Sequence, residues 1–254
     1  MNPTDLLDLA RRAARGAGEL LLERFRGAPR GVESKSTPTD LVSDADLEAD
    51  RFLQAFISTE RPDDGFITEE SAGRDSTSGL VWVLDPLDGT VNYLFRIPWW
   101  SVSVAVEDAD GIVAGAVFHP SLDEMFTATR GGGAFLNGEP ILVSERDDLP
   151  KAMIATGFSY DASVRAVQAK LLTHLLPRVR DVRRNGSAAL DLCGVACGRF
   201  DGYYESATNH WDTAAGSLIV REAGGSYSET VGPGQFVLAT NGELHDELLA
   251  LVSG

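Results

Sequence analysis

Two aspartates three positions apart follow a hydrophobic run in the first half of the chain. Residues 81–84 read Val-Trp-Val-Leu, which is typical of a buried strand, and Asp85-Pro86-Leu87-Asp88 follows directly. Because Pro86 fixes φ and donates no hydrogen bond, we expect the strand to end there in a turn. Such a turn can direct both carboxylates and a main-chain carbonyl, such as that of Leu87, into one small volume. Hard divalent cations such as Mg²⁺ prefer oxygen ligands of this kind.

The next two residues suit a phosphate group. Gly89 allows close approach to the backbone, and Thr90 supplies a hydroxyl where a short helix could begin. Free N–H groups at the start of a helix can bind an anion. An ordinary surface turn is the alternative, because Asp, Pro and Gly are all common in turns. The two aspartates alone leave both interpretations open.

The unbroken string from Asp85 to Tyr93 is more specific. It reads Asp-Pro-Leu-Asp-Gly-Thr-Val-Asn-Tyr and closely resembles the Asp-Pro-(Ile/Leu)-Asp-Gly-Thr-x-Asn-(Phe/Tyr) signature of the inositol monophosphatase family. The resemblance implies an α+β protein, folded as a layered αβαβα sandwich of the sugar-phosphatase type shared with fructose bisphosphatase. It also implies a single domain over residues 1–254. The approximate halves would be 1–145, with the metal-binding motifs, and 146–254, with the substrate-recognition elements.

A pair of adjacent glutamates precedes this string. Residues 68–71, Thr-Glu-Glu-Ser, resemble the family's Gly-Glu-Glu-Ser, with Thr68 in place of the glycine. In an extended backbone the two glutamate side chains would point in opposite directions, so only one could easily join a site formed by the two aspartates. The resemblance implies that Glu69 is a metal ligand that acts with Thr90 on the attacking water, and that Glu70 supports it.

An earlier loop and helix also match the family. Residues 27–39 are rich in Gly, Pro, Ser and Thr and predict a loop that contains Lys35. The pattern Lys-x₄-Asp-Leu-Val-x₃-Asp resembles the family's mobile loop and the helix after it. This implies that Lys35 and Asp46 lie near the metal cluster and that Asp40 holds the loop. For the other acids of this helix, such as Asp50, complementing the helix dipole is the stronger interpretation.

The second half carries another signature. Trp211-Asp212 precedes Thr-Ala-Ala-Gly, a run of small residues that we expect to pack tightly as a helix. A capping role would explain an aspartate at this place. However, Trp-Asp-x-Ala-Ala-Gly resembles the family's second motif, in which Asp212 completes the metal site. Glu205, seven residues earlier, matches the family's acid that accepts hydrogen bonds from substrate hydroxyls.

A Gly-Ser-Ala stretch in the second half could also contact a ligand. Ser187 and Ala188 follow a turn and lead into a predicted helix, whose start could bind an anion or a hydroxyl-rich ligand. An ordinary helix cap is an equal alternative. The stretch resembles a substrate-contacting element of the family. The substrate-binding set that we expect is Asp88, Gly89, Thr90, Ser187, Ala188, Glu205 and Asp212.

The remaining pattern gives the elements that must position these residues. Apolar residues at helical spacing predict helices over 4–26 and 164–176. Alternation predicts a strand hairpin over 101–118, and further strands follow at 124–128 and 133–136. The second half alternates strand and helix. Cys193 and Cys197 lie four apart in a predicted helix, and we expect both to be reduced thiols without a catalytic role.

Composition narrows the classes of partner. The 254 residues include 22 basic and 38 acidic side chains, which give a formal net charge of −16. This charge argues against general affinity for nucleic acid or for an anionic membrane. No secretory leader pattern and no run of 18 apolar residues is present, so we expect a cytoplasmic protein.

The resemblance as a whole implies a Mg²⁺-dependent, lithium-sensitive phosphomonoesterase that forms a homodimer. Two to three Mg²⁺ ions, with Mn²⁺ as a substitute, would be held by Glu69, Asp85, Asp88, Asp212 and the Leu87 carbonyl. The first substrate expected is myo-inositol 1-phosphate. Histidinol phosphate, fructose 1,6-bisphosphate and nucleotides remain open, because Glu205 could pair with an ammonium group and Arg183 and Arg184 could contact a second phosphate. A non-catalytic regulatory protein with the same fold is the alternative from another class.

Overall fold

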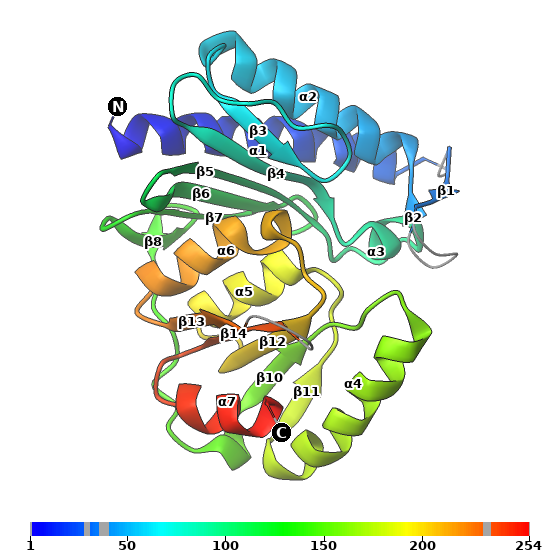
Figure 1. The fold of residues 1–254 in the computed structure, drawn as a ribbon, viewed down its shortest axis with the longest axis vertical. Coiled ribbons are helices and arrows are strands. Elements are labelled where there is room, and N and C mark those ends of the chain that lie inside the picture. The colour runs from blue at the N-terminus through cyan, green and yellow to red at the C-terminus, as the bar shows by residue number, and fades with distance from the viewer. Residues whose placement is uncertain (1, 28–30, 36–40, 231–234, 254) are drawn as a thin grey trace.

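Five layers of helix and sheet alternate along the long axis of the molecule (Figure 1). The computed structural model describes residues 2–27, 31–35, 41–230 and 235–253, so Asp40 lies outside the described residues. From one end to the other the layers are a helix pair, a large sheet, a second helix pair, a smaller sheet and a third helix pair. The predicted αβαβα sandwich is therefore confirmed.

The helix pairs come from distant parts of the sequence. The first pair covers the outer face of the large sheet, the second lies between the two sheets, and the third covers the smaller sheet (Figure 1). Their bounds, in that order, are α1 (Pro3–Phe25) and α2 (Asp44–Glu60), α5 (Ala188–Ala196) and α6 (His210–Glu222), and α4 (Ala162–Leu175) and α7 (His245–Val252). Among the described helices, none is both long and apolar enough to cross a membrane.

The large sheet is mostly antiparallel. In the part of the chain that the structure describes it has seven strands in sequential order, and β3 and β4 are its parallel pair. The strands are β3 (Gly65–Thr68), β4 (Val81–Asp88), β5 (Ser101–Asp108), β6 (Gly111–His119), β7 (Glu124–Thr129), β8 (Gly133–Leu136) and β9 (Glu139–Pro140). The predicted hairpin over 101–118 corresponds to β5 and β6.

The smaller sheet mixes parallel and antiparallel pairs. Its described strands are ordered β11-β10-β12-β14-β13, and β10 runs parallel to both of its neighbours. The strands are β10 (Met153–Thr156), β11 (Asp181–Arg183), β12 (Gly202–Ser206), β13 (Ser226–Glu229) and β14 (Phe236–Thr240). Because β10 and β12 are parallel, the loops that follow them open at the same edge of the sheet.

Short elements complete the chain. A two-stranded ribbon and a one-turn helix lie near the end of β4 in Figure 1, and two 3₁₀ helices flank the segment from β10 to α4. They are β1 (Glu33–Ser34), β2 (Leu41–Val42), α3 (Thr90–Leu94), η1 (Leu149–Lys151) and η2 (Leu176–Arg178).

The helix over residues 4–26 forms as predicted, as α1. Its apolar face is fully buried against the large sheet, which explains why spacing alone located it. The buried side chains include Leu6, Leu9, Ala10, Ala13, Ala17 and Leu21. A second core cluster joins the opposite face of this sheet to α5 and α6, and a third lies under the smaller sheet against α4 and α7.

Candidate active site

The aspartates of the first motif lie at the end of β4. Asp85 and Asp88 are 1% and 8% exposed, and the amide of Leu87 donates to Asp85 Oδ1 at 3.0 Å. The prediction that the strand ends at Pro86 is wrong, because β4 continues to Asp88. Asp85 pairs with Ser103 and Asp88 with Ser101, so β4 carries one extra residue in this interval. This irregularity accommodates a proline that cannot donate to the ladder.

Asp88 is bound by the start of α5, from the other half of the chain. Its carboxylate accepts hydrogen bonds from the Ser187 hydroxyl, from the Ala189 amide at 2.9 Å and from the Ala188 amide at 3.2 Å. Burial raises the pKa of Asp88 to about 6, although these donors oppose the rise. The helix start thus binds a carboxylate of the protein itself. Contact of Ser187 and Ala188 with a substrate stays a prediction.

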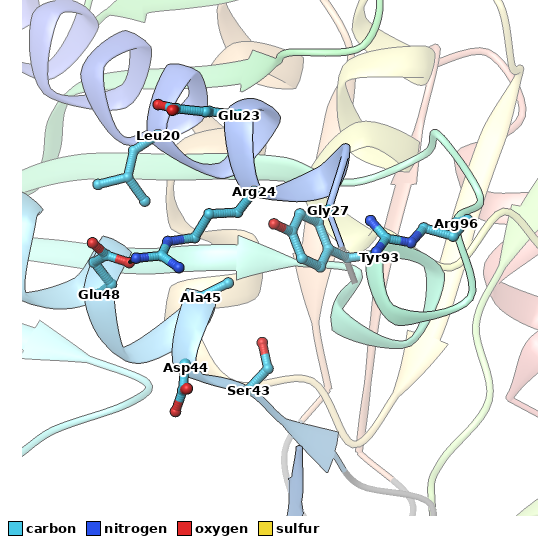
Figure 2. Close-up of a pocket in the computed structure, with 10 residues that line it drawn as sticks. All are labelled: Leu20, Glu23, Arg24, Gly27, Ser43, Asp44, Ala45, Glu48, Tyr93 and Arg96. Carbon is cyan, nitrogen blue, oxygen red and sulfur yellow. Dashed lines mark ion pairs between the residues drawn. The ribbon is translucent and has the colours of Figure 1, made fainter. Parts of the chain in front are cut away.

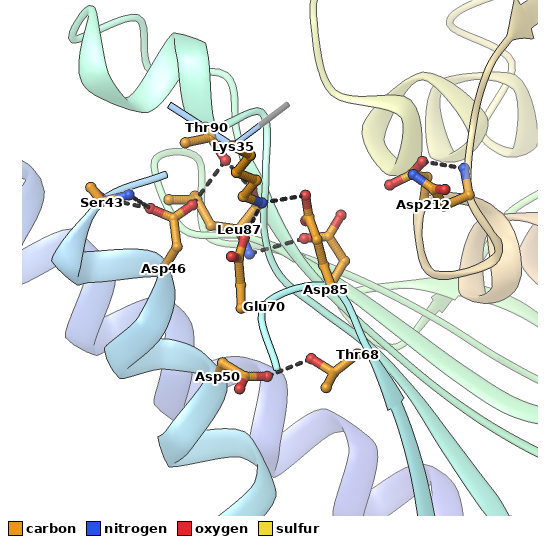
Figure 3. Close-up of polar contacts among 12 residues, drawn as sticks. Lys35, Ser43, Asp46, Asp50, Thr68, Glu70, Asp85, Leu87, Thr90 and Asp212 are labelled. Atoms are coloured by element: carbon orange, nitrogen blue, oxygen red, sulfur yellow. Dashed lines mark hydrogen bonds and ion pairs between the residues drawn. The ribbon is translucent and has the colours of Figure 1, made fainter. Parts of the chain in front are cut away.

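The glutamate pair follows β3 and meets Lys35. The backbone bends at Glu69 and Glu70. Lys35 Nζ donates to Glu69 Oε1 at 2.8 Å, and it also donates to Glu70 Oε1 at 2.6 Å, the contact labelled in Figure 3. The backbone is not extended here, and the bend lets both carboxylates reach one ammonium group, yet only Glu69 of the pair lines the cavity, as expected. Glu69 lines the site cavity with Asp85, and Lys35 lines it too. Burial opposes the charge on Lys35, but the two glutamates outweigh it and raise the lysine pKa.

Asp46 and Thr90 are joined directly. The Thr90 hydroxyl lies 2.9 Å from Asp46 Oδ1 and 3.0 Å from the Leu87 carbonyl, so its single proton is shared between two acceptors (Figure 3). Asp46 also closes a capping box with Ser43 at the start of α2, at 2.9 Å from the Ser43 amide. Burial raises the pKa of Asp46. The sequence placed these residues near each other by resemblance, and the structure gives the contact.

Asp212 lies on the opposite side of the site, at the start of α6. It is the third residue of the helix and accepts the Asn209 amide at 2.6 Å in a second capping box. Figure 3 shows it well apart from Asp85 and Lys35. Burial, and then the negative charges of Glu69 and Asp88, raise its pKa well above the usual value. Its capping contact is the one that the sequence allowed as the alternative to a metal-ligand role.

Glu205 is held on β12 by a tyrosine that sequence reasoning missed. Tyr203, two residues earlier on the same face, donates its hydroxyl to Glu205 Oε2 at 2.8 Å. A Cβ added to Gly157 would lie only 1.8 Å from that oxygen, so a larger residue there would displace the carboxylate from this position. Burial raises the pKa of Glu205 to about 7, against the effect of the Tyr203 hydrogen bond.

One cavity of about 620 Å³ connects these groups across both halves of the chain. From the predicted set its lining contains Lys35, Glu69, Asp85, Leu87, Asp88, Gly89, Thr90, Ala188, Glu205 and Asp212. Asp46 and Ser187 do not line it but contact Thr90 and Asp88, which do. Gly89 adopts φ 92°, and a Cβ there would lie 3.1 Å from the carbonyl oxygens of Gly186 and Trp99. A glycine at this position therefore leaves room for the close approach of Gly186 from the second half.

Other parts of the cavity wall were not among the predicted site residues, although Arg184 was considered as a contact for a second phosphate. The loop after β10 contributes Phe158, Ser159, Tyr160 and Asp161, and Arg184 and Asn209 come from beyond β11 and β12. The Arg184 guanidinium carbon lies 6.0 Å from the centroid of the Phe158 ring. The spacing Asn209-x-x-Asp212 is a capping-box pattern and could have identified Asn209. No local pattern identifies the loop after β10.

A second hollow of about 540 Å³ lies between α1, α2 and α3 (Figure 2). It contains the ion pair of Arg24 with Glu48 and is also lined by Tyr93 and Arg96. None of the predicted site residues lines it. It is therefore separate from the carboxylate site.

The donor chemistry of the site fits a hard cation. Asp85 and Asp88 are buried carboxylates, Glu69 and Asp212 are partly buried ones, and the pKa of Asp85 is raised well above its usual range by burial and then by the charges of the other three. The negative charges of such a cluster must be neutralised by bound protons or cations. Within the described residues, no three acidic, histidine or cysteine side chains already lie in an arrangement that would hold a metal ion.

Comparison with known proteins identifies the class. The sequence model described as "Inositol monophosphatase family" matches residues 2–252. An inositol-1-monophosphatase of Rhizobium meliloti is 42% identical over 234 residues, which are 91% of this chain and 87% of the relative. The Nus factor SuhB of Escherichia coli is 41% identical over 239 residues, 93% and 89% of the two chains.

Structural comparison agrees with the sequence match. The extragenic suppressor protein suhB of Bartonella henselae superimposes with a TM-score of 0.91 and 36% identity, over 98% of each chain. The chain belongs to the inositol monophosphatase family. This is a family of phosphatases that act on small phosphomonoesters and are generally metal-dependent.

Proposed function

We propose that this protein is a Mg²⁺-dependent phosphomonoester hydrolase whose preferred substrate is myo-inositol 1-phosphate. The observation that carries the proposal is the single cavity that is lined by Glu69, after β3, by Asp85 and Asp88, at the end of β4, and by Glu205 on β12. One side of this cavity has the chemistry for divalent cations and phosphate, and the other has an acceptor for hydroxyl groups.

Glu69, Asp85, Asp88, Asp212 and the Leu87 carbonyl would hold two to three ions, with Mn²⁺ as a substitute. Bound Mg²⁺ would lower the pKa of a water molecule and neutralise charge on the phosphate and the leaving oxygen. The network around the cavity supports the remaining roles. Because the Thr90 hydroxyl donates toward Asp46 and the Leu87 carbonyl, its oxygen keeps a lone pair that can orient the attacking water. Glu69 can accept a proton from that water.

Glu205 supports a polyol substrate. Its carboxylate lines the cavity, keeps one bond to Tyr203 and has further acceptor capacity for hydroxyl groups. Of the two arginines considered for a second phosphate, Arg183 pairs with Asp181 at 2.7 Å and is absent from the cavity lining, whereas Arg184 lines it. One arginine gives weaker support to a bisphosphate than a convergent pair would. Histidinol phosphate, whose ammonium group could pair with Glu205, is the main competing substrate.

The test is phosphate release from a panel of phosphomonoesters with Mg²⁺, repeated with added Li⁺ and with Asp88→Asn. Inositol 1-phosphate should be the best substrate, and Asp88→Asn should lower kcat/KM at least ~100-fold, because even outer partners of metal ligands cost 10- to 100-fold. Li⁺ should suppress the rate by competing for a Mg²⁺ position. Asp110→Asn, in the exposed turn between β5 and β6, is the control and should be as active as the wild type.

The outcomes separate the parts of the proposal. Preference for histidinol phosphate or a bisphosphate would keep the hydrolase and replace the substrate. A folded wild-type protein that hydrolyses nothing in the panel would contradict the enzyme. That result would favour a regulatory protein with this fold, an alternative suggested by the similarity to a Nus factor.

A further inference from the structure

Asp50 lies under the glutamate pair but outside the cavity. It follows Asp46 by one turn of α2, so both carboxylates project from the same face of the helix (Figure 3). Asp46 reaches Thr90, whereas Asp50 is 2% exposed and points to the end of β3. A carboxylate buried in this way needs hydrogen-bond donors from the protein.

Three side chains donate to Asp50. The Thr68 hydroxyl binds Oδ1, the Ser71 hydroxyl binds Oδ2 at 2.7 Å, and Gln54 Nε2 binds Oδ2 at 2.8 Å. Gln54 Nε2 also lies 2.7 Å from the Ser71 hydroxyl, which closes the network. A carboxylate with three donors is satisfied without any cation. Asp50 is thus a structural acceptor that belongs to no ligand set.

Two of these donors flank the glutamates directly. Thr68 is the last residue of β3 and Ser71 follows Glu70, so Asp50 is hydrogen-bonded to the residues on both sides of the glutamate pair. The main chain between them is held to β4 by a longer bond, from the Glu69 amide to the Leu84 carbonyl at 3.3 Å. The side-chain network therefore fixes the bend that brings Glu69 into the cavity and Glu70 to Lys35.

We propose that Asp50, acting with the Thr68 hydroxyl, is the positioning residue that holds the bend at Glu69 and Glu70 and so presents Glu69 to the cavity. The inference rests on the proposed function in that it takes Glu69 as a Mg²⁺ ligand. It also gives a role to Thr68, the position where this chain departs from the glycine of the family's motif. A threonine can supply the donor that a glycine lacks, and Asp50 supplies the buried acceptor.

The test compares Thr68→Val, Thr68→Ser and Asp50→Asn in the full-length protein. Calorimetry would measure Mg²⁺ binding without substrate, and amide hydrogen exchange of the metal-free protein would measure the order of residues 69–71. Thr68→Val and Asp50→Asn should raise the Mg²⁺ dissociation constant about tenfold, the loss expected when an outer partner of a ligand is removed. Both should also speed exchange at residues 69–71. Thr68→Ser keeps the hydroxyl and should stay close to the wild type in both measurements.

Asp64→Asn is the matched control. Asp64 is another fully buried aspartate with side-chain donors, namely Arg61, Ser78 and Trp82, but it precedes the opposite end of β3. Its variant should lower thermal stability and leave Mg²⁺ affinity unchanged. Equal loss of Mg²⁺ affinity in Asp64→Asn and Asp50→Asn would overturn the inference, because general destabilisation would then explain both.

Two further outcomes test the positioning role of Asp50. Wild-type Mg²⁺ affinity in Thr68→Val and Asp50→Asn would overturn the positioning role. If the wild-type protein itself binds neither Mg²⁺ nor Mn²⁺, the proposed function fails, and hydrogen exchange then decides the inference alone. In that case faster exchange at residues 69–71 in Thr68→Val but not in Thr68→Ser supports the role of Asp50, and unchanged exchange excludes it.

Discussion

Single residues at this site serve both the fold and the proposed chemistry. Asp88 is a predicted ligand, yet it also accepts the Ser187 hydroxyl and two amides of α5, which ties the two halves of the chain together. A buried carboxylate must be bound by donors or cations, and α5 supplies donors that need no metal. Asp46 and Asp212 likewise combine a capping box with a place beside the cavity. A substitution at any of the three therefore changes stability as well as the site.

Glu205 offers a cleaner test of substrate recognition at this scale. We expect Glu205→Gln to raise KM for inositol 1-phosphate about tenfold with little change in kcat, because hydrogen bonds to a charged group contribute about 1.5–3 kcal/mol and the amide keeps only part of this. The amide oxygen can still accept the Tyr203 hydroxyl. Steady-state kinetics would measure the effect.

The chain offers a matched control for this variant. Tyr227 donates to Glu229 on β13 at 2.7 Å, with the same spacing as Tyr203 and Glu205 but outside the site cavity. Glu229→Gln should leave KM unchanged. A Glu205→Gln enzyme with wild-type KM would remove Glu205 from substrate recognition, and a selective loss of histidinol phosphate hydrolysis would point to an ammonium partner.

Small residues let α6 pack closely against α5 and β6, and this packing positions residues of the site. On α6, Ala214 and Ala215 are buried, and a Cβ added to Gly216 would lie 2.6 Å from Leu192 Cδ1 on α5. On the other face, a Cβ at Gly115 of β6 would lie 3.0 Å from Ala215 Cα. The tight helix predicted for this small-residue run is therefore confirmed. Its close packing places Asp212, at the start of α6, beside the end of α5 that binds Asp88.

Overpacking this contact should cost stability. Gly216→Val is expected to lower the free energy of unfolding by about 2 kcal/mol, because inserted carbon atoms in a packed core typically cost about 1–3 kcal/mol. Urea unfolding followed by circular dichroism would measure it. Leu192→Ala creates space at the same place, so the double variant should be more stable than the sum of the two single effects predicts. Strict additivity would mean that Leu192 is not the residue that Gly216 accommodates.

At the scale of the whole molecule, a chain of net charge −16 concentrates buried and partly buried acids at and beside one cavity. Burial raises the pKa of Asp88 to about 6 and those of Glu70 and Glu205 to about 7, above the usual values of these groups. An acid whose pKa is raised by folding stabilises the native state below its unfolded pKa and loses that contribution as pH rises through the folded pKa. The metal-free protein therefore loses this stability between about pH 4 and pH 7.

Divalent cations should reverse this loss. We expect Mg²⁺ to raise the thermal midpoint more at pH 8 than at pH 5, because the carboxylates must be ionised to bind it and ligands of the native state stabilise by mass action. Differential scanning calorimetry with EDTA and with Mg²⁺ at the two pH values would measure the difference. An equal or larger Mg²⁺ effect at pH 5 would contradict a site built from these acids.

The sequence by itself determined the elements and site residues that local periodicity or a short motif identifies. Helical spacing located α1, alternation located β5 and β6, and the string from Asp85 to Tyr93 indicated the family that the comparisons confirm. These features depend on neighbours within a few turns or strand positions, so a short window of sequence contains them.

Only the tertiary structure decided which distant groups meet. It showed that the Ser187 hydroxyl donates a hydrogen bond to Asp88, 99 residues away. It also showed that the Thr68 hydroxyl at the end of β3 donates one to Asp50 on α2. It also placed the loop after β10 in the cavity wall and carried β4 past Pro86 through an irregular pairing with β5. Periodicity tells which face of an element is buried, but not which other element covers it. That choice depends on the layering of two sheets and six long helices, among the described residues, into one sandwich.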